Sequence, residues 1–155
     1  MQHKITKGRS SALRNGRYSN KDMIYHVTWT THLRQPYFNN FQTAQILAQE
    51  ILLLEKTHRT KSLAWVIMPD HFHWLLQLQD EPLTNLVKSL KARSALAINK
   101  SLTRSGIFWQ KGFYDRAVRY EDDIKSIARY IIANPIRAGL SKRIGDYPFW
   151  DACWL

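Results

Sequence analysis

Two histidines stand two residues apart inside an apolar stretch, Val66-Ile-Met-Pro-Asp-His-Phe-His-Trp-Leu-Leu-Gln-Leu78. Side chains at positions i and i+2 of a β-strand point to the same face, roughly 6–7 Å apart, so His71 and His73 could bind one cation. Histidine is also the commonest metal ligand. The spacing alone leaves a second interpretation equally open, in which both are half-buried side chains that satisfy their own hydrogen bonds.

The chain is strongly basic. Its 155 residues include 23 lysines and arginines against 12 aspartates and glutamates, which gives a formal net charge of +11, and 12% of the residues are aromatic. This balance indicates a polyanionic partner, with nucleic acid as the first candidate, although a solvated basic surface has the same composition. The length suits a single domain over residues 1–155, in which residues 1–22 form a basic N-terminal arm.

Other classes of protein find little support in the sequence. No run reaches the roughly 18 apolar residues that span a bilayer, and the N-terminal residues lack the apolar core of a signal peptide. We therefore expect a cytoplasmic protein without a membrane partner. The single cysteine, Cys153, cannot form an internal disulfide.

The elements that must position the histidines follow from hydrophobic periodicity. Strands are expected at residues 24–31, 63–68, 71–79 and 113–118, and helices at residues 41–56, 83–102 and 121–134. Only Pro69-Asp70 separates the second and third strands, which predicts an antiparallel hairpin with both histidines just past the turn. The order β-α-β-β-α-β-α is typical of a ferredoxin-like α+β sandwich, an antiparallel four-stranded sheet with helices packed on one face.

The third expected helix carries a tyrosine away from its apolar face. That face consists of Ile124, Ile127, Ala128, Ile131 and Ile132. Tyr130 lies more than about 100° from the centre of this face. Asn134 follows Tyr130 by four residues and lies on the same side of the helix if the last turn holds. Pro135 predicts that the helix ends near Asn134. A surface tyrosine beside a helix-ending asparagine is the plainer interpretation. A phenol with a pKa of about 10 is a poor nucleophile at neutral pH, but a cation that polarises a phosphodiester would help it.

Three motifs together resemble a known family. Met68-Pro-Asp-His-Phe-His-Trp-Leu-Leu76 is similar to the His-hydrophobe-His motif of the single-tyrosine HUH transposases, the IS200-like family. Residues 108–119 and 128–140 resemble its branch of REP-associated tyrosine transposases, and the similarity covers about residues 18–150 in the same order.

The resemblance implies a fold and a chemistry. The histidine pair would lie on a central strand of a ferredoxin-like sheet, Tyr130 would be the nucleophile, and His71, His73 and Asn134 would bind Mg²⁺ or Mn²⁺. The implied activity is cleavage and rejoining of single-stranded DNA next to a hairpin, a REP-like palindrome, through a 5′-phosphotyrosine, by a protein that we expect to be a monomer. A non-catalytic nucleic-acid-binding regulator that keeps the fold is the alternative.

Basic and aromatic side chains are candidates for DNA contact, with cations for phosphates and a ring for stacking on unpaired bases. For each of them a solvated or core position is the competing interpretation. We also expect the N-terminal arm to read a short sequence beside the hairpin, because the resemblance places that role at this end. The candidate DNA-binding residues are Arg14, Arg17, Lys88, Lys91, Trp109, Lys111, Arg116 and Arg119.

Overall fold

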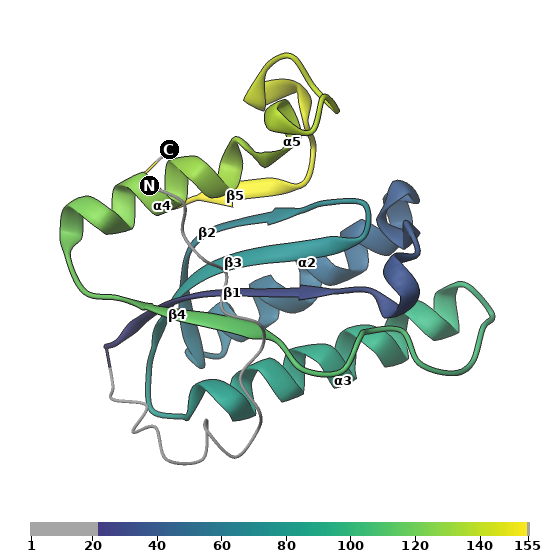
Figure 1. The fold of residues 1–155 in the computed structure, drawn as a ribbon. Helices are drawn as coiled ribbons and strands as arrows, with labels where there is room; N and C mark the ends of the chain where they lie inside the picture. Colours follow the sequence, from purple (N-terminus) through teal and green to yellow (C-terminus); the bar gives the residue numbers. More distant parts are fainter. Residues whose placement is uncertain (1–21, 155) are drawn as a thin grey trace.

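The computed structural model describes residues 22–154 as an α+β sandwich built on one antiparallel sheet (Figure 1). The strands lie in the order β4-β1-β3-β2-β5. Every neighbouring pair is antiparallel, and β2 and β3 form the predicted hairpin. The strands are β1 (Ile24–Thr30), β2 (Thr60–Ile67), β3 (His71–Leu78), β4 (Tyr114–Val118) and β5 (Trp150–Ala152).

The helices follow the predicted ranges closely. They are α2 (Phe41–Lys56), α3 (Leu83–Ser101), α4 (Glu121–Ile132) and the short α5 (Asn134–Arg137). Helix α2 begins after Asn40, whose side chain accepts a hydrogen bond from the Thr43 backbone N–H at 3.2 Å and so caps the helix. Between residues 22 and 154, no helix combines the length and the apolar character needed to cross a membrane.

Alternation along the strands divides the apolar core between the two faces of the sheet. On one face, Trp29 and Trp74 pack with side chains from α2 and α3 in the larger cluster. On the other face, Leu75 packs with Ile131 of α4 in a smaller cluster. The prediction that the helices share one face is therefore wrong for α4. Its apolar stripe must be covered by the sheet, and α2 and α3 already fill the first face.

The fifth strand was not predicted. Strand β5 has only three residues and pairs with β2, with Trp150 opposite Val66 and Ala152 opposite Ala64. So short a segment shows no clear alternation in the sequence, and only its pairing makes it a strand. The sheet is consequently five-stranded, while the predicted βαββαβ arrangement of the first four strands is confirmed. Strand β5 also covers the edge of β2 that would otherwise be open.

Candidate functional site

Both histidines of the pair lie on the α4 face of β3. They alternate with Phe72 and Trp74, which are fully buried in the cluster beneath α2 and α3. The ring centroids of His71 and His73 are 5.1 Å apart. The structure thus brings the two imidazoles together on one face, as their spacing predicted, and it does so because the neighbouring aromatic residues fix the strand's orientation.

His71 is held by a carboxylate in the hairpin turn. Its Nδ1 lies 2.7 Å from Asp70 Oδ1, and Arg34 Nε donates to Asp70 Oδ2 at 3.0 Å. Partial burial opposes ionisation of Asp70, but hydrogen bonds from His71 and Arg34 outweigh it and keep the pKa of the carboxyl below its ordinary value. An ionised carboxylate only accepts hydrogen bonds, so His71 carries its proton on Nδ1.

His73 points its Nδ1 toward β1. This atom lies 3.1 Å from His26 Nε2 and 3.1 Å from Thr28 Oγ1. Burial lowers the pKa of His26 to about 4, with a further contribution from the positive charge of Arg116. Both atoms that face His73 therefore belong to neutral side chains at physiological pH.

The pKa of His73 is also well below its ordinary value. Burial is the main cause, followed by the charges of neighbouring groups, among them Arg137 on α5. A neutral imidazole keeps one nitrogen with a lone pair, as metal binding requires. Within residues 22–154, the Nε2 atoms of His71 and His73 make no hydrogen bond, so both can serve as ligands.

Tyr130 lies near the C-terminal end of α4 and is 56% exposed, in agreement with its predicted position off the apolar stripe. The guanidinium carbon of Arg137 is 3.7 Å from the centroid of the tyrosine ring, a cation–π contact. Arg137 also donates to the Tyr130 carbonyl at 2.6 Å. The positive charge of Arg137 also contributes, as the smallest of the named causes, to the lowered pKa of His73. Figure 1 shows α5 beyond the C-terminal end of α4, on the side of the sheet where β2 turns into β3.

Asn134 begins α5, directly after the chain leaves α4. Its Nδ2 donates to the Ile131 carbonyl at 2.9 Å and reaches the Tyr130 carbonyl at 3.4 Å. Pro135 follows in the first turn of α5, in agreement with the prediction that the tyrosine helix ends near Asn134. The amide nitrogen is thus engaged, and Oδ1 makes no hydrogen bond to any residue that the structure describes.

Comparison with known proteins identifies the family. Residues 19–134 match the family described as "Transposase IS200 like". The chain belongs to the IS200-like transposase family. The resemblance inferred from the motifs is thereby confirmed.

Named relatives lie in the REP-associated branch. The "REP-associated tyrosine transposase" of Escherichia coli K12 is 28% identical over 108 residues, which cover 68% of this chain and 62% of that protein. A Haemophilus influenzae protein provisionally given the same name is 26% identical over 124 residues, 73% of this chain and 67% of that protein. The chain thus matches somewhat less than two thirds of the length of the Escherichia coli relative.

A solved structure has the same fold. It is described as a REP-associated tyrosine transposase bound to a REP hairpin, and it superposes with a TM-score of 0.70 at 24% identity. The match covers 86% of this chain and 79% of that one. At this identity the likeness establishes the fold alone.

The prediction that Trp109 of this IS200-like family member contacts DNA is wrong. Trp109 is only 5% exposed, its Nε1 donates to Ser94 Oγ at 3.0 Å, and its ring meets Trp29 edge-on at 5.9 Å. A ring buried in this way cannot stack on a DNA base. The mixed aromatic and polar segment around it gave no periodicity from which burial could be inferred.

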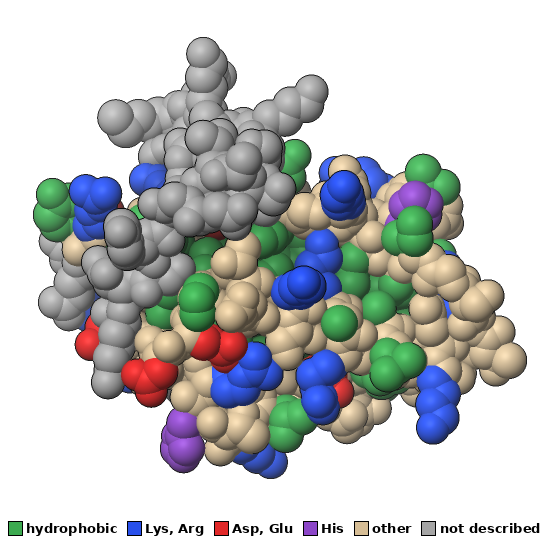
Figure 2. All heavy atoms as spheres, turned by 90° about the horizontal axis from the view of Figure 1, so that it is seen from below, with side chains coloured by type: hydrophobic (Ala, Val, Ile, Leu, Met, Phe, Trp, Pro, Cys, Tyr) green, Lys and Arg blue, Asp and Glu red, His purple; other side chains and the backbone are tan. Residues whose placement is uncertain are grey.

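The basic candidates separate by position. Lys91 on α3 donates from Nζ to the carbonyls of Gln110 and Gly112, at 2.8 Å each, so it holds a loop and does not offer a free ammonium to phosphate. Lys88 is exposed on the same helix, across the sheet from the histidines. Figure 2, which looks from the side of β4 and α3, shows lysine and arginine side chains spread among hydrophobic and other ones.

Other basic candidates lie nearer the histidines or beyond the described region. Arg116 on β4 is exposed and stands opposite His26 in the strand register, so it belongs to the α4 face. Lys111 is exposed in the loop before β4, and Arg119 is exposed directly after this strand. Arg14 and Arg17, like all of the arm up to residue 21, lie outside the described residues.

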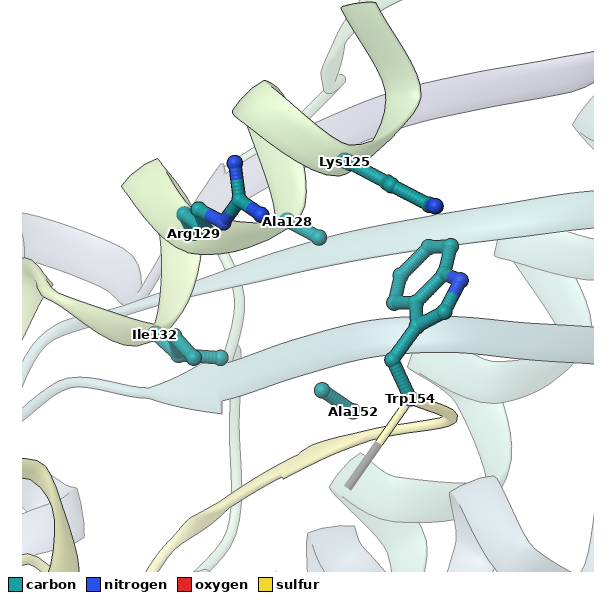
Figure 3. A pocket seen from close by; sticks show the side chains of 6 residues that line it. All are labelled: Lys125, Ala128, Arg129, Ile132, Ala152 and Trp154. Atoms are coloured by element: carbon teal, nitrogen blue, oxygen red, sulfur yellow. The ribbon is translucent and has the colours of Figure 1, made fainter. Parts of the chain in front are cut away.

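A groove runs between α4 and β5 on the flank of α4 away from Tyr130 (Figure 3). Its lining combines two exposed cations with apolar side chains and the indole of Trp154. It does not contain the histidine pair. The lining residues are Lys125, Ala128, Arg129, Ile132, Ala152 and Trp154.

Four residues around the histidines were missed by the sequence analysis. Arg137 follows Tyr130 by seven positions, a helical spacing that could have indicated a shared face. His26 alternates with the apolar residues of β1, so its orientation was readable, but its partner is 47 residues away. Asp70 was interpreted only as a turn residue, and nothing in the sequence connects it with Arg34.

Proposed function

We propose that this chain is a transposase and endonuclease that cleaves and rejoins single-stranded DNA next to a hairpin, with Tyr130 as the nucleophile. The observation that carries the proposal is the placement of the paired histidines on the face of the sheet covered by α4, the helix that also carries the exposed Tyr130. The exposed tyrosine and the histidine pair thus lie on the same side of the sheet, and Arg137 contacts the tyrosine ring there at 3.7 Å. The names of the relatives, and the REP hairpin bound in the similar structure, support hairpin DNA as the substrate.

The residues fit a divalent cation. His71 and His73 each offer an Nε2 lone pair, and Asn134 offers an amide oxygen, so we assign these three as its protein ligands. This mixture of nitrogen and oxygen donors suits Mn²⁺ or Mg²⁺, with the imidazoles favouring Mn²⁺. When bound there, the cation would align the scissile phosphate and take up part of its developing negative charge.

The chemistry assigned to Tyr130 is a transesterification. Its phenolic oxygen forms a bond to the scissile phosphorus as the bond from phosphorus to the 3′-oxygen breaks. The phenolic proton passes to solvent, and the released 3′-oxygen takes a proton to become a free hydroxyl. Because the phosphotyrosine keeps the ester bond, a 3′-hydroxyl from another strand can reverse the step and join a new end, which hydrolysis would prevent.

We propose further that one chain contains a complete site and that the protein acts as a monomer. Tyr130 and Arg137 contact each other at the end of α4, and the histidine pair lies on the face of the sheet that α4 covers, all within a single chain. No exchange of the tyrosine helix between subunits is needed to bring them together.

DNA would approach the α4 face. Arg116, Lys111 and Arg119 supply exposed cations along β4 and its flanking segments. The groove of Figure 3 adds Lys125 and Arg129 beside the Trp154 indole, a combination that suits phosphate contact and base stacking. Lys88 faces away from the histidines, and we assign it no contact with the scissile strand.

The test is a cleavage assay with a hairpin oligonucleotide that carries a single-stranded flank, in the presence of Mn²⁺. Wild-type protein should form a covalent adduct on a denaturing gel and release a free 3′-hydroxyl fragment. Tyr130→Phe should bind the hairpin equally well and form no adduct. The matched control is Tyr120→Phe, because Tyr120 is also exposed (71%) and precedes the same helix.

Two outcomes would contradict the proposal. An adduct that persists in Tyr130→Phe and vanishes in Tyr120→Phe would move the nucleophile, and hairpin binding by a wild-type protein that never forms an adduct would favour the regulator. Mixing Tyr130→Phe with His71→Ala tests whether one chain supplies the whole site. The mixture should stay inactive, and restored cleavage would mean that two chains contribute to one site.

A further inference from the structure

The two proposed ligands each have one ring nitrogen already engaged by a neighbour. His71 Nδ1 is 2.7 Å from Asp70 Oδ1, and His73 Nδ1 is 3.1 Å from His26 Nε2. Imidazole binds a metal through its unprotonated nitrogen, so a neutral ring must carry its proton on the other nitrogen. The partners of Nδ1 therefore decide whether Nε2 is a ligand.

The His71 side of this arrangement is set by charge. Asp70 accepts from His71 on one oxygen and from Arg34 on the other, at 2.7 and 3.0 Å. Arg34 has a positive φ of 51°, uncommon for a residue other than glycine, and such strain persists only where the surroundings hold it. Hydrogen bonds from Thr31 N to the Asp70 carbonyl (2.9 Å) and from Phe38 N to the Pro69 carbonyl (3.0 Å) hold this loop on the turn.

We propose that His26 is the corresponding positioning residue for His73, accepting the Nδ1 proton so that Nε2 of both histidines presents a lone pair to the α4 face. Thr28 Oγ1 lies 3.1 Å from His73 Nδ1 and 3.5 Å from His26 Nε2. The proton can thus be donated directly to His26, or to the hydroxyl, which then donates its own hydrogen to His26. Either route ends on the His26 lone pair. The proposal extends the metal site proposed above and rests on it.

The position of His26 supports this role. His26 lies on β1, and its side chain is on the same face as that of Thr28. Thr28 stands directly opposite His73 of β3 in the strand register. Its ring centroid is 5.3 Å from that of His73, so the contact is between ring edges and not a stack. A hydrogen-bond acceptor on the second ring nitrogen, most often a carboxylate, carbonyl or water, orients a metal-binding histidine and fixes its tautomer, and His26 is placed to act in the same way.

The experiment reads the tautomers directly in ¹⁵N-labelled protein without metal, near pH 8, by long-range ¹H–¹⁵N correlation. In wild-type protein both rings should carry the proton on Nδ1. His26→Leu removes the acceptor at similar volume and should shift His73 toward a mixture of tautomers while His71 is unchanged. Asp70→Ala should do the reverse, so each variant is the control for the other.

Two more variants sharpen the assignment. His26→Gln places an amide oxygen near the former Nε2 and should restore the His73 tautomer. Thr28→Val should leave it intact, because the direct contact with His26 remains. A wild-type His73 with its proton on Nε2 would overturn the proposal, and so would a tautomer that changes in Thr28→Val but not in His26→Leu. If His26→Leu does not fold, the wild-type and His26→Gln spectra still decide.

Mn²⁺ titration followed by electron paramagnetic resonance gives a second measurement that requires no DNA. His26→Leu should weaken Mn²⁺ binding by about 10- to 100-fold, the usual effect of removing such a partner, and His26→Gln should recover most of the loss. Wild-type protein that binds no Mn²⁺, yet has both protons on Nδ1, would overturn the metal site and leave the role of His26 in place. A bound cation that perturbs His26 Nε2 and His73 Nδ1 would overturn the role of His26.

Discussion

The two faces of the sheet are built from the same strands and differ in the side chains that they present. Toward α2 and α3, Trp29, Phe72 and Trp74 lie fully buried among aliphatic side chains. Toward α4, the same two strands present His26 and His73, beside a smaller apolar cluster. Adjacent residues of one strand therefore have different roles, one in the packing of the core and the next in the proposed site.

This difference shows how a small domain can hold polar groups in fixed positions. Neutral imidazoles at half-buried positions lose solvation, and only defined hydrogen bonds compensate for that loss. The face toward α2 and α3, the aromatic face, contains the larger cluster of buried apolar side chains. We expect it to hold the strands in register even when residues of the α4 face, the polar face, are substituted. We therefore expect mutations on the two faces to separate stability from activity.

The largest effect is expected on the polar face. His71→Ala and His73→Ala should each abolish hairpin cleavage in the gel assay, because each removes a proposed ligand, while hairpin affinity changes little. Chelation of metal by EDTA should have the same effect on wild-type protein. Cleavage at the wild-type rate by either variant would show that the pair is structural.

The aromatic face should show the reverse. Trp74 adjoins His73 in sequence, is fully buried, and donates from Nε1 to Ser62 Oγ at 2.8 Å. Trp74→Ala should lower the free energy of unfolding by about 3–5 kcal/mol, against about 1 kcal/mol or less for His73→Ala, as measured by urea denaturation. Equal losses in the two variants would mean that both faces carry stability alike.

A smaller effect should distinguish cations on the two sides. Arg116→Ala, on the polar face, should reduce the slope of log K against log salt for hairpin binding by about one unit, the value for one lost phosphate contact. Lys88→Ala, on α3, should leave the slope unchanged. Fluorescence anisotropy at several salt concentrations measures both. A larger change in Lys88→Ala would place DNA on the α3 side.

The smallest effect concerns the β5 edge. Tyr147 donates from its hydroxyl to the Ile67 carbonyl at the end of β2, and burial raises the pKa of Tyr147 to about 12. Its pKa in the unfolded chain is about 10, so the folded state favours the protonated phenol, and this stabilisation is lost as pH rises between these values. Tyr147→Phe should therefore lose less stability than wild type between pH 10 and 12 in urea titrations. Parallel losses would show that the phenol titrates alike in both states.

Much of the architecture could be predicted because it depends on local periodicity. The bounds of α2 and the start of β3 follow from the spacing of apolar residues, and the exposure of Tyr130 follows from its angle to the stripe of α4. The shared face of His71 and His73 follows from the two-residue period of a strand. These features depend only on residues close together in the chain, so they could be predicted without the tertiary structure.

Contacts between distant segments decided the rest. Which face α4 covers depends on the space that α2 and α3 have already filled, and the burial of Trp109 depends on Ser94 and Trp29. The engagement of His73 by His26 and of Asp70 by Arg34 joins residues 47 and 36 positions apart. No local pattern encodes such pairs, because each forms only when strand register and loop conformation bring its two members together.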